Sequence, residues 1–225
     1  MKPKSTLRIF LALAGSSLLA IYTAHAATLT WDHDTDGAAS DGNGTWLGTS
    51  QWLDAGSPAD WNNATPDNAI IGSGGAGGTI TLGAVSAGTV LLDNFTGTYQ
   101  LNIGPLDVSG GITIGANAGN VNLPLSITGT GGITVNGPVR VNLRDSGKTF
   151  SGDLVINAGE VLDYQFNDLG TGNLNINGGV LVGYWGETMT RTLGAGAGEI
   201  QIPGGESGFC GQGSNGSAVK INNSD

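Results

Sequence analysis

The amino-acid sequence predicts an all-β protein, a right-handed parallel β-helix (β-solenoid) with an irregular Trp-rich cap at its amino-terminal end. Three observations support this prediction. The 225 residues include 41 glycines and only 12% charged residues, short apolar runs recur at a nearly constant spacing, and most of the tryptophans lie together near the start. Because a glycine inside a helix costs about 1 kcal/mol relative to alanine, the glycine content excludes an all-helical fold.

Four short segments align without gaps and predict one strand in each coil of the solenoid. They are GITIG at 111–115, GITVN at 132–136, DLVIN at 153–157 and NLNIN at 173–177. The first apolar position of each segment gives a column that advances by nearly equal steps: Ile112, Ile133, Leu154 and Leu174. The second apolar position gives another column with the same steps: Ile114, Val135, Ile156 and Ile176.

A second set of strands follows each of these segments after a Gly-rich turn. Its apolar column advances by a constant step: Val121, Val141, Val161 and Leu181. Upstream, 78–82 and 89–92 are expected to form earlier coils, with Leu91 lying one repeat step before Ile112. A repeat unit of about 20 residues cannot bury its apolar face alone, so the coils are expected to stack about 4.8 Å apart. An antiparallel sandwich also uses short alternating strands, but it does not explain the constant step.

Residues 1–26 have the features of a secretory signal peptide. An apolar stretch at 9–22 follows three positive residues: Lys2, Lys4 and Arg8. Ala24 and Ala26 are the small residues that a signal peptidase accepts, so cleavage is predicted after Ala26. The apolar stretch is shorter than the roughly 20 residues of a membrane-spanning helix, and no later segment comes close, so no transmembrane helix is expected in the mature chain. An uncleaved amino-terminal anchor is the alternative.

Residues 27–72 differ in composition and are expected to form the amino-terminal cap, with 73–225 assigned to the solenoid repeats. The segment holds four of the five tryptophans: Trp31, Trp46, Trp52 and Trp61. The end of a solenoid exposes apolar core and sheet edges, and large aromatic side chains can cover them. The alternative is a platform of exposed tryptophans on which sugar rings stack.

The segment from Asp32 to Gly37 carries the only motif in the sequence that resembles a metal-binding loop. Asp32, Asp34 and Asp36 have the D-x-D-x-D-G spacing that directs alternate carboxylates toward a hard cation such as Ca²⁺. Position 12 of such a loop is Asn43 rather than Glu, and no helix is expected to follow, so an EF-hand is excluded. A solvated acidic turn is the alternative. We therefore assign no metal site, no cofactor and no catalytic residue, and keep calcium binding as a hypothesis. His33 is expected to be a surface residue.

The remaining charged residues and the single cysteine give weak signals. A solvated charged face is expected from the basic cluster, Arg140, Arg144, Asp145 and Lys148, and from the nearby carboxylates, Glu160, Asp163 and Asp168. The alternative is an enzyme site, because β-helix polysaccharide enzymes place such residues on one flank of the solenoid. Cys210 is expected to be a small half-buried thiol, with a dimerising or reactive thiol as the alternative. The net charge of −10 argues against nucleic acid as a partner.

Several segments resemble a known bacterial family. They are TLTWD at 28–32, DGNGTW at 41–46, WNNATPDNAIIG at 61–72, GTITLGAVSAGTVLLDN at 78–94, the repeat-like stretch 149–181 and the tail 190–209. In this order they are similar to the autotransporter-associated β-strand repeat proteins of verrucomicrobia and planctomycetes. The resemblance implies an exported β-solenoid passenger, adhesin-like, at the cell surface or the outer membrane, with no catalytic residues to carry over.

These observations predict a non-catalytic secreted or cell-surface β-solenoid that acts as an adhesin-like passenger or a structural stalk. Its partner would be an extracellular surface or a polysaccharide. The alternative is a carbohydrate-active module that binds or cleaves polysaccharide along the solenoid groove. Val219 and Ile221 alternate with polar residues like a strand that enters the stack. The chain is therefore expected to be truncated at its carboxy terminus and to self-associate through the last solenoid edge.

Overall fold

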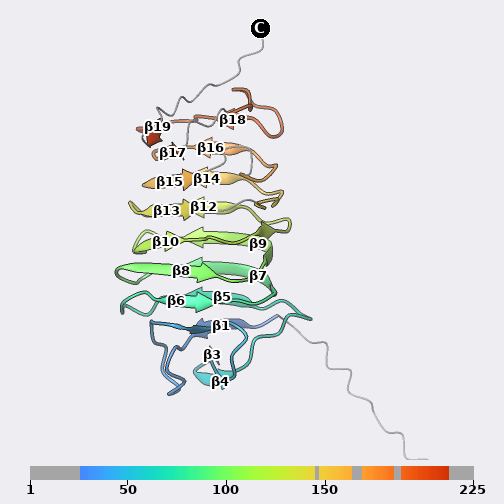
Figure 1. The fold of residues 1–225 in the computed structure, drawn as a ribbon, viewed down its shortest axis with the longest axis vertical. Coiled ribbons are helices and arrows are strands. Elements are labelled where there is room, and N and C mark those ends of the chain that lie inside the picture. The colour runs from blue at the N-terminus through green and yellow to red at the C-terminus, as the bar shows by residue number, and fades with distance from the viewer. Residues whose placement is uncertain (1–25, 145–146, 164–168, 185–188, 213–225) are drawn as a thin grey trace, which may run out of the picture.

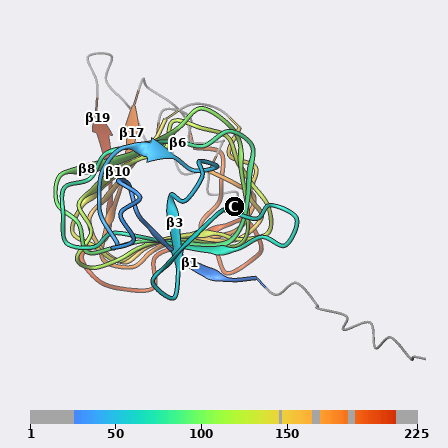
Figure 2. The same cartoon turned by 90° about the horizontal axis from the view of Figure 1, so that it is seen from below.

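The computed structural model describes residues 26–144, 147–163, 169–184 and 189–212. These residues form strands and turns without a helix, so none of them belongs to a helix that could cross a membrane. The coils stack along the long axis of the molecule (Figure 1) and lie over one another when viewed along that axis (Figure 2). The predicted signal peptide lies outside the described residues, apart from Ala26.

Two long sheets run the length of the stack. In spatial order, the larger, 11-stranded sheet holds β18 (Ile200–Gln201), β16 (Leu174–Ile176), β14 (Leu154–Ile156), β12 (Ile133–Val135), β9 (Leu106–Ile114), β7 (Val85–Leu92), β5 (Asn68–Ile71), β1 (Thr28–Trp31), β3 (Trp52–Asp54) and β4 (Ser57–Ala59), with β11 (Ile127–Thr128) beside β9. The 8-stranded sheet holds β19 (Gly208–Gln212), β17 (Val180–Tyr184), β15 (Glu160–Asp163), β13 (Arg140–Leu143), β10 (Asn120–Asn122), β8 (Thr98–Asn102), β6 (Thr79–Thr81) and β2 (Gly44–Thr45).

Neighbouring coils pair in parallel with the register that the repeat predicts. Ile133 stands opposite Ile112 and Leu154, and Leu174 stands opposite Leu154. In the second sheet Val161 stands opposite Val141 and Leu181. Each of these side chains is buried, and burial of one Leu or Ile contributes about 1.5–3 kcal/mol. The prediction of a parallel β-solenoid is therefore confirmed.

One register prediction upstream is wrong by a single residue. Val90, and not Leu91, stands opposite Ile112, while Leu91 stands opposite Thr113 and is only half-buried. The register shifts between Ala87 and Thr89, where β9 carries one extra residue. Such a β-bulge moves every later side chain of the strand to a new partner, which residue spacing alone does not reveal.

Some corners bring successive coils so close that only glycine fits. Gly72 has a φ of 126°, and a Cβ atom built on it would overlap the carbonyl oxygen of Asp93 in the next coil. No side-chain movement relieves this contact, because the neighbouring atom belongs to the backbone. The high glycine content is thus partly a consequence of coil-to-coil contact at the corners.

The amino-terminal end is closed by an aromatic cluster and two antiparallel strands. Strand β1 joins the coil stack by parallel pairing with β5, whereas β3 and β4 turn back in antiparallel pairing below it. Four tryptophans pack with ring centroids 4.8–5.1 Å apart and are buried: Trp31, Trp46, Trp52 and Trp61. The prediction that these tryptophans cover the end of the solenoid is confirmed, and the alternative of an exposed platform for sugar rings is wrong. Pro58, which lacks a backbone N–H, lies in the outermost strand.

The other end of the larger sheet is partly closed by the chain itself. The N–H of Ile200 donates to the carbonyl of Thr192 at 2.8 Å, and the N–H of Gly194 donates to the carbonyl of Ile200 at 3.1 Å. The guanidinium of Arg191 donates to the carbonyls of Leu169, Gly170 and Gly172. Burial lowers the pKa of Arg191. Val219 and Ile221, the predicted last strand, lie outside the described residues.

Candidate functional site

The acidic loop after β1 brings three carboxylates together. Asp32, Asp34 and Asp36 each place an oxygen within 4.8 Å of the others. Asp32 is buried and accepts a hydrogen bond from the N–H of Gly37, while Asp34 and Asp36 are exposed. Since Ca²⁺ binds oxygen ligands at about 2.3–2.6 Å, this spacing is compatible with one shared cation. The predicted convergence of the three side chains is therefore present, and calcium binding itself stays a hypothesis.

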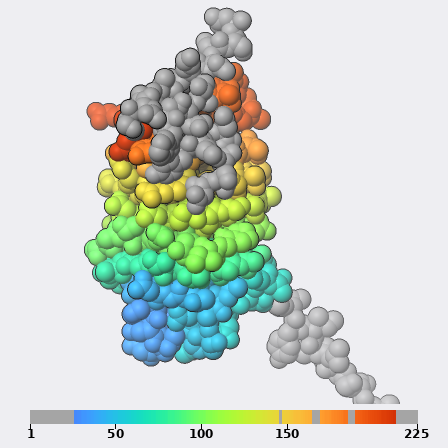
Figure 3. All heavy atoms as spheres, viewed as in Figure 1, coloured from blue at the N-terminus to red at the C-terminus, as the bar shows by residue number. Residues whose placement is uncertain are grey.

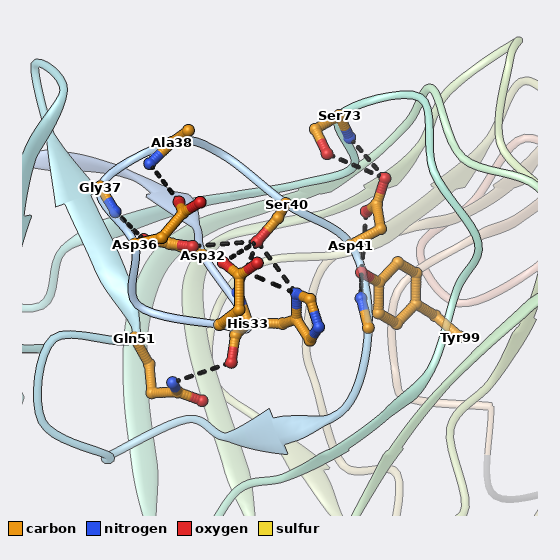
Figure 4. Close-up of polar contacts among 12 residues, drawn as sticks. Asp32, His33, Asp36, Gly37, Ala38, Ser40, Asp41, Gln51, Ser73 and Tyr99 are labelled. Carbon is orange, nitrogen blue, oxygen red and sulfur yellow. Dashed lines mark hydrogen bonds and ion pairs between the residues drawn. The ribbon is translucent and has the colours of Figure 1, made fainter.

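Ser40 links the loop internally (Figure 4). Its hydroxyl oxygen lies 2.9 Å from Asp32 Oδ1, 2.8 Å from Asp34 Oδ1 and 3.0 Å from His33 Nδ1. A serine hydroxyl has one hydrogen, so it can donate to only one carboxylate at a time. The hydrogen bond from Ser40 is the main reason that the pKa of Asp34 lies below its usual value. The loop is thus already ordered by its own protein contacts.

The next acidic and amide side chains after the loop, Asp41 and Asn43, bind residues of the following coils instead of residues of the loop. One oxygen of Asp41 accepts hydrogen bonds from Ser73, and the other accepts one from the Tyr99 hydroxyl at 2.8 Å (Figure 4). The N–H of Gly75 also donates to Asp41. Asn43, which stands at position 12 of the motif, accepts from the N–H of Thr79 at 2.7 Å. The calcium-like motif therefore ends at Gly37. Asp41 and Asn43 form hydrogen bonds between the first coil and the following coils.

Much of the outer surface of the coil stack carries amide and hydroxyl side chains. Asn157 Nδ2 donates to Asn136 Oδ1 at 2.8 Å, and Asn177 Nδ2 donates to Asn157 Oδ1 at 3.3 Å. In the smaller sheet the buried Asn142 continues this pattern, with its Nδ2 donating to Asn122 Oδ1. In such ladders one amide side chain bonds to the equivalent side chain of the next coil. They stabilise the stack and leave a neutral polar surface.

A polar groove of about 230 Å³ crosses the outer face of the larger sheet. Its lining combines glycines with two threonines and one carboxylate: Gly110, Gly111, Ile112, Thr113, Gly132, Thr134, Asp153 and Val155. Asp153 accepts hydrogen bonds from the N–H of Asn173 at 2.8 Å and from Asn175 Nδ2 at 3.1 Å. The carboxylate is thus engaged by the following coil, and the groove offers mainly backbone and hydroxyl groups.

A second hollow, of about 290 Å³, lies on the outer face of the smaller sheet. It spans four successive strands, β13, β15, β17 and β19, and is lined by Arg140, Glu160, Val180, Val182, Cys210, Gly211 and Gln212. We name it the Arg140–Glu160 pocket. Arg140 Nε and Nη2 both donate to Glu160 Oε2, at 2.8 and 2.6 Å. Both side chains are about two-fifths exposed.

The other predicted charged residues do not join this pocket. Glu160 and Asp163 lie three positions apart on β15, so their side chains leave opposite faces of the sheet. The expectation of a solvated face is wrong for Lys148 and Asp163, which are 2% and 1% exposed, and Lys148 Nζ donates to the carbonyl of Arg144 at 2.5 Å. Asp145 and Asp168 lie outside the described residues. The structure therefore keeps Arg140 and Glu160 together and separates Asp163 and Lys148 from them.

Cys210 is exposed, so the expectation of a half-buried thiol is wrong. It stands opposite Val182 on the outer face of β19, which is the last strand of its sheet among the described residues. Sequence reasoning also missed the two pocket valines. Val180 could have been found, because Arg140, Glu160 and Val180 follow each other at the constant step of the repeat.

The fold defines the class of this chain: it is a parallel β-solenoid protein. Comparison with protein-family models, with curated proteins and with solved structures gave no match.

Proposed function

We propose that this chain is a non-catalytic, exported β-solenoid that acts as an adhesin-like passenger or a structural stalk. The observation that carries the proposal is the neutral polar outer surface formed by coil-to-coil ladders such as Asn136, Asn157 and Asn177. A stack whose outward asparagines bond to one another from coil to coil suits a spacer or a display scaffold. The resemblance to autotransporter-associated β-strand repeat proteins and the predicted leader at 1–26 support location at the outer membrane or outside the cell.

The alternative is a carbohydrate-active module, and one observation favours its binding form. Arg140 and Glu160 converge in an open pocket instead of lying scattered on the surface. The cleaving form would use two carboxyl groups that face one bond. Glu160 and Asp163 face opposite sides of their strand, so this pair does not support cleavage.

Self-association through the carboxy-terminal edge stays a prediction. Gly208 donates its N–H to the carbonyl of Gly179 in the preceding coil, so the alternate residues Phe209 and Gly211 direct their backbone groups away from β17. Sedimentation velocity of residues 27–225 is expected to show concentration-dependent association through this edge. A monodisperse monomer at high concentration would contradict it.

The experiment that tests the main proposal is expression of the full chain, with a carboxy-terminal tag, in a Gram-negative bacterium. We expect a mature protein that begins at Ala27 and that makes the cells, or beads coated with it, adhere to extracellular matrices. Ala24→Asp places a charge at the cleavage site and should leave the leader attached. Retention of unprocessed chain in the cytoplasm, or depolymerisation of a polysaccharide by the pure protein, would contradict the proposal.

A further inference from the structure

We propose that the Arg140–Glu160 pocket binds one neutral pyranose unit of an extracellular glycan. The inference rests on the proposed function, because it names the ligand class of the exposed solenoid surface. Its first support is size. A volume of about 290 Å³ is at the lower end of small-molecule sites, so the pocket suits a single sugar ring rather than a larger ligand.

The second support is the hydrogen-bonding capacity of the ion pair. Both hydrogen bonds between the two side chains end on Glu160 Oε2. Within the described part of the chain, Glu160 Oε1 and Arg140 Nη1 take part in no hydrogen bond, although the two side chains hold each other in place. The pocket thus presents a carboxylate acceptor next to a guanidinium donor. Two adjacent hydroxyl groups, one donating to Oε1 and the other accepting from Nη1, match this arrangement.

The third support is the lining beside the ion pair. Val180 and Val182 occupy the outward positions of β17, directly after Glu160 and Leu162 in the pairing register. Val180 is half-buried and gives the pocket an apolar wall on which the C–H face of a pyranose ring can rest, whereas Val182 is only 3% exposed and adds little surface. Binding sites of this kind combine an apolar lining with a few placed polar groups. Gln212 brings an amide side chain to the lining.

Charge decides which sugars fit. The positive charge of Arg140 is balanced by Glu160 at 2.6 Å, so the pocket has no excess of positive charge to attract a uronic acid. A ligand carboxylate would also approach the Glu160 carboxylate and be repelled by it. The geometry therefore points to neutral hexoses and to glycans built from them.

Cys210 makes the proposal measurable, because this exposed thiol lines the pocket and is the single cysteine of the chain. The test is the rate at which a chromogenic aromatic disulfide modifies Cys210 in the folded mature protein. Glucose, galactose, mannose and their short oligosaccharides would be added at up to about 50 mM, a range that covers millimolar dissociation constants. Glucuronate and galacturonate serve as the acidic comparison.

We expect at least one neutral sugar to slow the modification in a saturable manner, and the uronates to have less effect. Glu160→Gln keeps the shape of the side chain but removes the charged acceptor. It should raise the sugar concentration needed for half-maximal protection of Cys210 at least about tenfold. Thr98→Ala, in the same outward column three coils below Glu160, is the matched control and should leave protection unchanged.

Two results would overturn the assignment. One is that no sugar of the panel slows modification of Cys210, and the other is that the uronates protect more strongly than the neutral sugars. A thermal-shift measurement on Glu160→Gln shows whether the variant is folded. Because export and surface display are measured separately, failure of the pocket assignment is distinguishable from failure of the proposed function.

Discussion

Leu154 and Leu174 are one repeat apart in the chain and stand directly opposite each other in parallel strands of adjacent coils. Both side chains are buried, and each lies in a column of apolar residues that runs through the stack. Figure 3 shows the result of many such pairs: the chain occupies successive layers in sequence order along the long axis. Each coil therefore depends on its neighbours for burial of its apolar face.

The first prediction concerns this column. Leu154→Asp buries an unpaired charge between two coils and should lower the free energy of unfolding by more than about 3 kcal/mol. Thr134→Asp, at a half-buried outward position of the neighbouring strand β12, should cost less than about 1 kcal/mol. Urea unfolding followed by circular dichroism compares the two variants. Equal losses would contradict the assignment of inward and outward faces.

The second prediction concerns close contact at a coil corner. Gly72→Ala should destabilise the protein strongly, because its Cβ atom would overlap the Asp93 carbonyl oxygen. Gly56 also has a positive φ, 82°, but no atom lies within 4 Å of its Cβ position. Gly56→Ala should therefore cost only the backbone strain of about 1 kcal/mol. If thermal melting shows the two variants to be equally stable, coil contact is not the reason for glycine at position 72.

The third prediction concerns alkaline pH. Burial and the hydrogen bond to Asp41 raise the pKa of Tyr99, whose hydroxyl also accepts the N–H of Gly42 at 3.0 Å. Its contribution to stability is complete below the unfolded pKa of about 10 and declines as the pH rises further. Tyr99→Phe should lose about 1–3 kcal/mol at neutral pH and show a weaker alkaline decline. Ultraviolet titrations of the folded protein and of Tyr99→Phe should coincide near pH 10, and an additional transition there in the unsubstituted protein would contradict this.

The fourth prediction tests calcium at Asp32, Asp34 and Asp36. With a dissociation constant of about 1 mM, about 5 mM free Ca²⁺ would stabilise the fold by about 1 kcal/mol and raise the melting temperature. A chelator should reverse the effect. The double variant Asp34→Asn and Asp36→Asn keeps the buried Asp32 and should abolish it. An unchanged melting temperature at millimolar calcium rejects the hypothesis.

The repeat was predictable from sequence because its apolar columns advance by nearly constant steps. The bulge before Gly111 was not predictable, because the spacing of apolar residues does not show which strand carries an extra residue. The extra residue in β9 places Val90 where Leu91 was expected. The antiparallel pairing of β3 and β4 likewise breaks the repeat. It lies in a segment where Trp clustering indicates burial but gives no strand order.

The candidate pocket was partly predictable. Arg140, Glu160 and Val180 share one position of the repeat, so their alignment alone places them on neighbouring strands. Cys210 follows Val182 after a step that is longer than the repeat, and only the structure brings it to the same site. The burial of Lys148 also depends on the path of the chain between strands, which carries no periodic signal.

The proposal that this solenoid is displayed outside the cell can be examined by labelling Cys210 in intact cells of the native host. After mild reduction, cells and medium are treated with a membrane-impermeant maleimide, with Cys210→Ser as the control for specificity. We expect the exposed thiol of Cys210 to be labelled in intact cells or in the medium to the same extent as after lysis. Labelling that appears only after lysis would contradict the claim.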